Sequence, residues 1–446
     1  MNLYARASYN FNRQWFAGAS ITFDAASSSG KNSGRFMALP SANIAWNLKN
    51  ASFLKDTDWL DNQTLRAEYG LTANSRFSSM FSQYVYTSQV YRDLTGIVRT
   101  GLPNSRLKSE KLLTTDIGVD FATRGNRFAL SVDLFEERTK DMLLQKNMSA
   151  AYGYGYMYEN AGELKNQGID VALQATLING KHFEWNVGGN ISTYRSEIIS
   201  LGNVNQKITK FSDGTTLISK VGESPYSFYG YVYDKVFASK AEADAAQLLS
   251  YSGRQFEAGD VKWKDFNGDH TIDENDMQLL GSAKPDFFGG FYTSLRYKNL
   301  SLHAQFTYSY GNKIYNAVRS DLESLSSFNN QSKIAVRRWN YDGQITDIPK
   351  AVYDDPNDNS RFSDRWVEDG SYLKLKNITL TYDVNRTFWF FRHAQIFLNG
   401  ENLWTCTKYL GLDPEFAYSY DPGTLGMDLG KAPLGKTIKI GLKLQF

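Results

Sequence analysis

The chain has little cysteine, histidine or proline, and it has no long apolar run. Among its 446 residues there is one cysteine, Cys406, which excludes an intramolecular disulfide and any metal site built from several cysteines. The four histidines, His182, His270, His303 and His393, lie far apart and show no metal-ligand spacing. Lys and Arg number 49 against 47 Asp and Glu, so the chain lacks the basic excess that is typical of nucleic-acid binders.

Two further absences bear on the membrane. No apolar run reaches about 18 residues, so no transmembrane helix is predicted, and the first residues lack the pattern of a signal peptide. The mean hydropathy of −0.45 is that of a soluble protein, but it is equally compatible with a β-barrel, whose strands are half polar. Aromatic residues make up 15% of the chain, which argues against disorder.

Apolar and polar residues alternate through most of the chain, and this is the period of a β-strand. In the last segment Ile438, Ile440, Leu442 and Leu444 alternate with polar residues and glycine. We expect about thirteen strands, each near or above the ~9–11 residues that a tilted strand needs to cross a bilayer. Their expected ranges are 2–11, 14–23, 35–48, 63–75, 111–122, 127–140, 164–178, 182–197, 287–298, 300–316, 371–384, 393–409 and 434–446.

The expected connections alternate in length. Tight turns are expected at 12–13, 124–126, 179–181 and 298–299, and long excursions at 76–110, 141–163, 198–286, 317–370 and 410–433. Short turns at one end and long loops at the other are typical of an outer-membrane barrel. The sequence therefore predicts an all-β fold, an antiparallel transmembrane β-barrel with long extracellular loops.

Three local features refine this prediction. The alternation changes phase between Leu375 and Ile378, which predicts a β-bulge near Asn377. Ser239 followed by Glu242 forms a capping box that predicts a short helix over 240–249, and a second helix is expected over 320–339.

The expected number of strands is odd, which conflicts with the even number in bacterial single-chain barrels. An open sheet would leave the backbone groups of two edge strands unpaired in hydrocarbon, at a cost of several kcal/mol each. We therefore expect residues 1–446 to be the C-terminal part of a larger barrel whose other strands come from elsewhere. A miscounted strand is the competing explanation.

Several segments resemble the SusC/RagA-like family of TonB-dependent outer-membrane transporters. The segments are 160–170 (NAGELKNQGID), 260–273 (DVKWKDFNGDHTID), 309–316 (SYGNKIYN), 370–377 (GSYLKLKN), 400–403 (GENL) and 409–415 (YLGLDPE). They occur in order along nearly the whole chain. The terminal Phe446 also resembles the signal that the bacterial barrel-insertion machinery reads.

The resemblance implies a barrel of about 22 strands in the outer membrane. It also implies an N-terminal plug with a TonB box, TonB as a partner, a SusD-like lipoprotein lid, and import of glycans (oligosaccharides) or peptides. The plug, the TonB box and the first strands are absent from these 446 residues, so we expect this chain alone to be inactive in transport.

One acidic segment has the spacing of an EF-hand-type calcium loop. The six positions that would carry ligands are Asp265, Asn267, Asp269, Thr271, Asp273 and Asp276. Oxygen ligands at this spacing suit Ca²⁺, but His270 occupies the position of the turn glycine and Asp276 replaces a longer glutamate. The sequence predicts a structural calcium site, with a solvated polar turn as the alternative.

Four tyrosines alternate with small residues in an expected extracellular loop. They are Tyr152, Tyr154, Tyr156 and Tyr158, and their rings are candidates for stacking on sugar rings of a substrate. The alternative is a hairpin that extends the barrel wall and carries interfacial tyrosines. The aromatic run Phe388–Phe391 is expected in an interfacial belt at the other end.

No arrangement of residues predicts catalysis, so we do not expect an enzyme. Acidic residues are plentiful but scattered, and without convergence they do not make a hydrolase. The alternative function, from another class, is a surface or secreted β-rich carbohydrate-binding or adhesin protein; a β-rich hydrolase is a third, weaker option. A need for detergent distinguishes the membrane protein from a soluble one.

Overall fold

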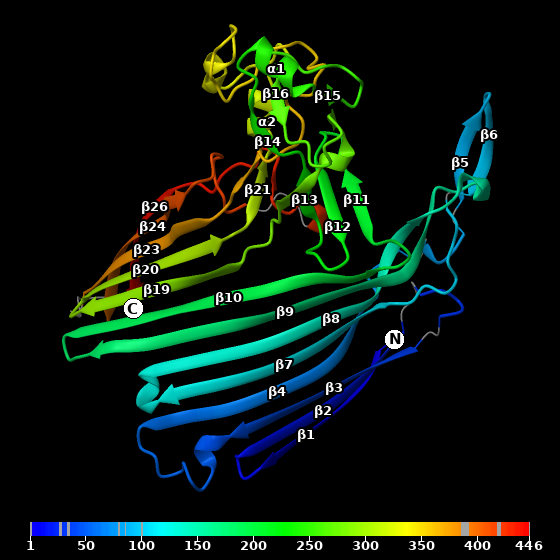
Figure 1. Cartoon of the computed structure of the whole chain (residues 1–446). Helices are drawn as coiled ribbons and strands as arrows, with labels where there is room; N and C mark the ends of the chain where they lie inside the picture. Colours follow the sequence, from blue (N-terminus) through cyan, green and yellow to red (C-terminus); the bar gives the residue numbers. More distant parts are fainter. Residues whose placement is uncertain are drawn as a thin grey trace.

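The computed structural model describes residues 2–25, 29–33, 36–78, 81–84, 86–99, 101–384, 392–416 and 421–445. Thirteen strands form one antiparallel sheet, here called the wall, which curves into an open trough (Figure 1). In spatial order these strands are β1 (Asn2–Phe11), β2 (Trp15–Ala25), β3 (Phe36–Asn47), β4 (Leu60–Asn74), β7 (Glu110–Thr123), β8 (Phe128–Asn147), β9 (Tyr156–Asn179), β10 (Phe183–Leu201), β19 (Phe287–Tyr297), β20 (Leu300–Tyr310), β23 (Tyr372–Val384), β24 (His393–Thr407) and β26 (Thr437–Gln445). Each matches one predicted strand, so the all-β prediction is confirmed.

The remaining elements lie in the connections between wall strands. The short strands are β5 (Tyr86–Tyr91), β6 (Leu94–Arg99), β11 (Gln206–Lys210), β12 (Thr216–Lys220), β13 (Ser227–Gly230), β14 (Tyr233–Val236), β15 (Leu249–Ser250), β16 (Val261–Trp263), β17 (Thr271–Ile272), β18 (Gln278–Gly281), β21 (Lys313–Asn316), β22 (Val367–Asp369) and β25 (Met427–Asp428). The α-helices are α1 (Lys240–Ala246) and α2 (Ala317–Glu323), and 3₁₀ turns occur at η1 (Leu48–Asn50), η3 (Arg124–Asn126), η4 (Ala150–Tyr152), η5 (Glu274–Asp276), η6 (Lys333–Arg337) and η7 (Pro422–Thr424). None of the helices in the described residues is long and apolar enough to span a membrane.

Short turns close one end of the wall, as predicted. Asn12 and Arg13 both have positive φ angles, of 53° and 55°, which is the backbone of a two-residue hairpin turn. The connection 48–59, which contains η1, is the longer exception at this end. The expected aromatic belt at Phe388–Phe391 and the terminal Phe446 lie outside the described residues.

The two faces of the wall differ in chemistry. The predicted alternation is present, and it leaves large apolar side chains exposed on one face, such as Ile440 at 80%. On the other face Arg66 forms ion pairs of 2.7 Å with Asp120 and 2.8 Å with Asp133. Aromatic pairs lie near both ends of the apolar face, including Trp15 with Trp46 and Phe287 with Tyr310. An apolar band between aromatic girdles is the outer surface of a membrane barrel.

The predicted bulge is confirmed on β23. Leu375 pairs with Phe306 and Asn377 with Gln305, so Lys376 has no opposite residue on β20. The extra residue changes the phase of the alternation and keeps Ile378 on the apolar face. Lys376, the unpaired residue, lies two positions after Lys374 on the same strand.

Two predicted elements need correction. The expected loop over 141–163 is mostly strand, because β8 continues to Asn147 and β9 begins at Tyr156. The helix expected over 320–339 is wrong: α2 ends at Glu323, and only the short turn η6 follows. Leu325 has a positive φ of 57°, which a continuous helix does not allow.

Candidate functional site

Three of the long connections gather at one end of the wall and pack into a body of their own. We call residues 202–286, 311–371 and 408–436, as far as they are described, the loop body (Figure 1). Its small sheets are β11–β12–β13–β18, β14–β16, β15–β17 and β22–β21–β25. The last sheet combines strands from two connections that are distant in sequence. The loop body is therefore a folded structure rather than a set of separate loops.

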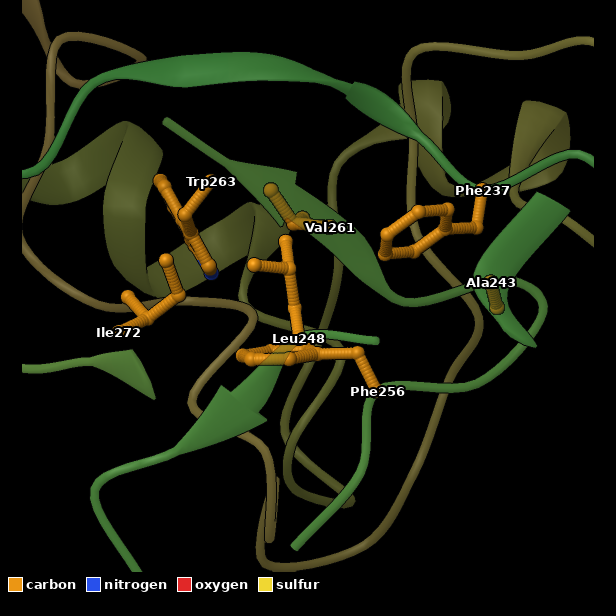
Figure 2. Close-up of a cluster of buried hydrophobic side chains, with 7 residues drawn as sticks. All are labelled: Phe237, Ala243, Leu248, Phe256, Val261, Trp263 and Ile272. Atoms are coloured by element: carbon orange, nitrogen blue, oxygen red, sulfur yellow. The ribbon is translucent and has the colours of Figure 1, made fainter. Parts of the chain in front are cut away.

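A hydrophobic core holds the first connection together. Phe237, Phe256, Val261 and Trp263 are fully buried and face one another (Figure 2). A second core contains Trp366 and residues from all three connections; its other members are Leu217, Phe228, Tyr315, Phe362 and Met427. Burial of this apolar area stabilises the loop body in the same way as the core of a soluble domain.

A buried carboxylate joins the two longest connections. Asp260 accepts hydrogen bonds of 2.9 Å from the amide of Asn359 and 2.8 Å from the amide of Asn357, and it lies 3.2 Å from Lys350 Nζ. The Asn359 side chain in turn accepts the backbone N–H of Val261. The partners are nearly a hundred residues apart in sequence, so the network fixes the relative position of the connections.

Arginines stack on aromatic rings between these connections. The Arg361 guanidinium lies 4.6 Å from the centroid of the Tyr231 ring and 5.2 Å from that of Trp263. Arg365 lies 4.8 Å from the Trp366 ring and 5.3 Å from that of Tyr233. Burial lowers the pKa of both guanidinium groups, which stay charged because arginine starts far above neutral pH. No pattern in the sequence pointed to these residues.

A buried ion-pair cluster attaches the loop body to the wall. Lys374, with only 2% of its surface exposed, bonds both carboxylate oxygens of Asp413 at 2.9 and 2.8 Å and lies 3.0 Å from Glu415. Lys376, the bulge residue, bonds both oxygens of Glu415 at 2.8 Å. Two lysines of β23, one of them the bulge residue, therefore bind one acidic loop.

The acidic segment 265–276 is held by its own hydrogen bonds. Asp265 accepts the backbone N–H groups of Gly268 and His270, and His270 has a φ of 62°, the conformation that a turn glycine would adopt. Asp276 is fully buried and accepts the N–H groups of Phe266 and Asp273. Asp265 thus holds a turn like that of an EF-hand loop, and His270 takes the backbone conformation of the turn glycine.

The six predicted ligands do not converge in this structure. Asn267 donates to Asp269, Asp269 accepts from Thr271, and Asp273 accepts from Asn275, so their polar atoms are engaged within the loop. In the part of the chain that the structure describes, no group of three or more His, Cys, Asp or Glu side chains is arranged to hold a metal. The calcium site stays a prediction.

The four predicted tyrosines are divided between strand and turn. Tyr156 and Tyr158 lie on β9, as the hairpin alternative expected, while Tyr152 and Tyr154 lie in the turn before it. The Tyr158 ring stacks on Phe81, with 3.9 Å between centroids, and Asn104 donates to the Tyr158 carbonyl. The connection 75–109 therefore packs on the tip of the β8–β9 hairpin. Substrate binding by these tyrosines stays a prediction.

An apolar cavity of about 290 Å³ opens on the loop body beside α2. Val318 and Leu322 line it from the helix, Ile334 from η6, and Leu410 and Leu412 from the last connection. Leu410 and Leu412 are themselves largely exposed. Exposed apolar groups around a hollow are typical of a surface that contacts another protein.

Comparison with known proteins agrees with this architecture. Residues 1–403 match the family model for the TonB dependent receptor-like β-barrel. TonB-dependent receptor P3 of Formosa agariphila is 29% identical over 464 residues, covering 100% of this chain and 45% of the relative. TonB-dependent receptor SusC of Bacteroides thetaiotaomicron is 25% identical, covering 100% of this chain and 44% of the relative.

A solved structure gives the same result. The structure of the RagAB peptide transporter superposes with a TM-score of 0.83 at 25% sequence identity, covering 100% of this chain and 47% of that one. The chain therefore spans less than half the length of the relatives that it matches. The resemblance inferred from the sequence motifs is confirmed.

Proposed function

Because the chain belongs to the TonB-dependent receptor-like β-barrel family, whose members reside in the outer membrane, we propose that it forms the C-terminal part of the wall of an outer-membrane importer. The cargo is an oligosaccharide or a peptide. The observation that carries the proposal is the combination of a lipid-facing apolar wall with a folded loop body at one end. A secreted adhesin or sugar-binding protein would have no use for the exposed apolar face.

The edges of the wall favour further strands outside these residues. Within the described residues β1 pairs only with β2, and β26 pairs only with β24. Because strands alternate in direction, β1 and β26 run the same way and cannot close on each other in an antiparallel ladder. We propose that strands from outside residues 1–446 close the barrel and that a plug pulled by TonB occupies it.

A cavity on the loop body is consistent with a second protein that covers the outer end of the barrel as a lid. The apolar cavity beside α2, with Leu410 and Leu412 exposed on its rim, suits an aliphatic side chain from a protein seated on the outer end. A SusD-like lipoprotein is the proposed occupant. Placing a charge on the apolar rim with Leu412→Asp should reduce co-purification of that lipoprotein, and Leu425→Asp on another exposed leucine should not.

An uptake assay tests the proposed function. Cells that carry the gene at its own locus would be compared with a deletion strain for growth on, and uptake of, oligosaccharide and peptide mixtures. We expect uptake that is lost both on deletion and on removal of TonB. Uptake that survives deletion, or that needs no TonB, would contradict the proposal. The 446-residue chain expressed alone with a signal peptide should give no uptake, because its edges are open.

A further inference from the structure

One arginine in the connection 75–109 is surrounded by tyrosines. Arg99 ends β6, and its guanidinium lies 4.6 Å from the centroid of the Tyr84 ring and 6.0 Å from that of Tyr86. Hydrogen bonding to Tyr86 and, to a lesser extent, to Tyr154 raises the pKa of the Arg99 side chain. Tyr154 comes from the turn of the β8–β9 hairpin, so two connections form this cluster.

Arg99 differs from the arginines of the loop body. Arg319 pairs with Glu323 and Glu368, at 3.2 and 2.9 Å, and Arg361 lies buried beside Asp358. Arg99 is exposed, and none of the described carboxylates lies within ion-pair distance of it. A guanidinium held by rings and hydroxyls keeps the geometry that binds a carboxylate or sulfate through two parallel hydrogen bonds.

The sequence around Arg99 is also positively charged. Residues 75–109 contain five basic side chains and a single acidic one, Asp93. The basic residues are Arg76, Arg92, Arg99, Arg106 and Lys108. Such a surplus attracts anionic ligands to this part of the outer surface.

Aromatic surface lies beside the charge. Tyr84, Tyr86, Tyr152 and Tyr156 are all exposed. Tyr84 and Tyr86 lie in the connection that holds Arg99, and Tyr152 and Tyr156 lie at the tip of the β8–β9 hairpin. Flat aromatic faces suit the C–H faces of sugar rings. A positive charge beside exposed aromatic rings favours an acidic saccharide over a peptide, because a peptide backbone has no flat C–H face to stack on the rings.

We propose that Arg99, Tyr84, Tyr86 and Tyr154 form a subsite for the carboxylate or sulfate group of an acidic oligosaccharide. The guanidinium binds the anion, and the tyrosines hold the guanidinium and stack on adjoining sugars. This inference rests on the proposed function of the chain as an importer wall, and it deepens that function by naming the substrate class.

Binding to isolated outer membranes tests the subsite in the protein as cells make it. Four fluorescent probes are used: tetragalacturonate, a sulfated galactan tetrasaccharide, its desulfated counterpart, and a pentapeptide with a free C-terminus. Wild type is compared with Arg99→Gln, Arg99→Lys and the control Arg76→Gln, which removes the same charge from an exposed arginine of the same connection. Protease resistance of the barrel confirms folding of each variant.

We expect at least one acidic saccharide to bind better than the neutral one, and Arg99→Gln to weaken that binding about ten- to hundredfold, the usual cost of losing a charged hydrogen bond. Arg99→Lys should recover part of the affinity. Arg76→Gln, which removes one charge of the surrounding surplus and none from the subsite, should lower it far less than Arg99→Gln does. Equal binding of acidic and neutral probes, an Arg99→Gln variant that binds like wild type, or a loss confined to the peptide would overturn the subsite. If the subsite fails in this way, TonB-dependent uptake of neutral cargo would still support the proposed function of the chain as part of an importer.

Discussion

The wall and the loop body use the same residue types in opposite ways. In the wall, large apolar side chains such as Ile440 are exposed, and the polar residues pair across the inner face. In the loop body, Trp263 and Trp366 are at most 1% exposed, and polar groups such as Asp260 are buried among partners. The difference shows that each region is folded for its own solvent, lipid for the wall and water for the loop body.

The wall and the loop body are attached to each other at the ion-pair cluster around Lys374. Lys374 belongs to the wall, yet it is as buried as the core of the loop body because Asp413 and Glu415 cover it. Two charges of each sign meet there once Lys376 is included; Lys374 and Asp413 are buried, and Lys376 and Glu415 are partly exposed. The wall and the loop body should therefore lose their mutual order when this cluster is broken.

The largest expected effect comes from deleting a buried ring of the loop body. Trp366→Ala should destabilise the loop body by about 3–5 kcal/mol, because it leaves a cavity in a closed core. Protease digestion of outer membranes would show rapid cleavage of the loop body with the wall intact. The matched control, Trp404→Ala on the apolar face of β24, should leave loop-body digestion unchanged. Greater loop cleavage in Trp404→Ala than in Trp366→Ala would contradict the separation of the regions.

Breaking the attachment should be nearly as costly. Lys374→Ala leaves the buried carboxylate of Asp413 without its cation, while the partly exposed Glu415 keeps Lys376, at an expected cost of about 3–5 kcal/mol. Hydrogen exchange of the peptide that contains 408–416 would measure it. Lys439→Ala, which removes a more exposed pair with Glu401, should cost about 0–1 kcal/mol. Similar exchange in both variants would rule out the special role of the buried cluster.

A third comparison uses two exposed isoleucines. Ile440→Arg should cost about 2–4 kcal/mol and lower the amount of folded protein in the membrane, because the charge faces lipid. Ile345→Arg, at a position 93% exposed on the loop body, should have little effect because it faces water. Heat-dependent migration on gels reports the folded barrel. Equal yields of the two variants would remove the argument for a lipid face.

The pH dependence of the loop body gives a smaller effect. Burial and the adjacent Asp428, to which the Tyr409 hydroxyl donates at 2.7 Å, raise the pKa of Tyr409 above its ordinary value of 10.0. The folded state thus holds the proton more tightly, so the stabilisation is complete below pH 10 and falls as the pH rises above it. Tyr409→Phe should abolish this added alkaline loss. A variant with an unchanged slope above pH 10 would show that another group titrates.

The calcium loop is expected to give the smallest effect. Since its side chains are already satisfied by hydrogen bonds, Ca²⁺ should add only modest protection of 265–276 in hydrogen exchange. Asp265→Ala combined with Asp269→Ala should abolish that protection, and Asp244→Ala on α1 should not. Identical exchange with and without calcium in the wild type would end the prediction.

The wall could be predicted from the sequence because its information is local. A period of two residues defines each strand, and a single change of phase defines the bulge at Lys376. The one misplaced connection, 141–163, partly follows the same rule, because Tyr156 and Tyr158 of its alternating tyrosines are strand residues of β9.

The interior of the loop body could not be predicted in this way. Asp260 meets Asn359 from across 99 residues, and Arg361 finds the Tyr231 ring from another connection. No local period encodes such contacts. Arg99 was missed for the same reason, since its tyrosines come from two connections. An exposed arginine among tyrosines in an otherwise basic loop was the available signal.

Labelling of single cysteines in intact outer membranes with a water-soluble maleimide tests most directly whether the wall faces lipid and the loop body faces water. With the exposed Cys406 replaced by serine, Ile440→Cys and Ile345→Cys are compared. Both positions are highly exposed in the structure, at 80% and 93%. We expect rapid labelling at 345 and protection at 440 until detergent and denaturant remove the lipid and unfold the wall. Rapid labelling at both positions in the intact membrane would show that the wall does not face lipid.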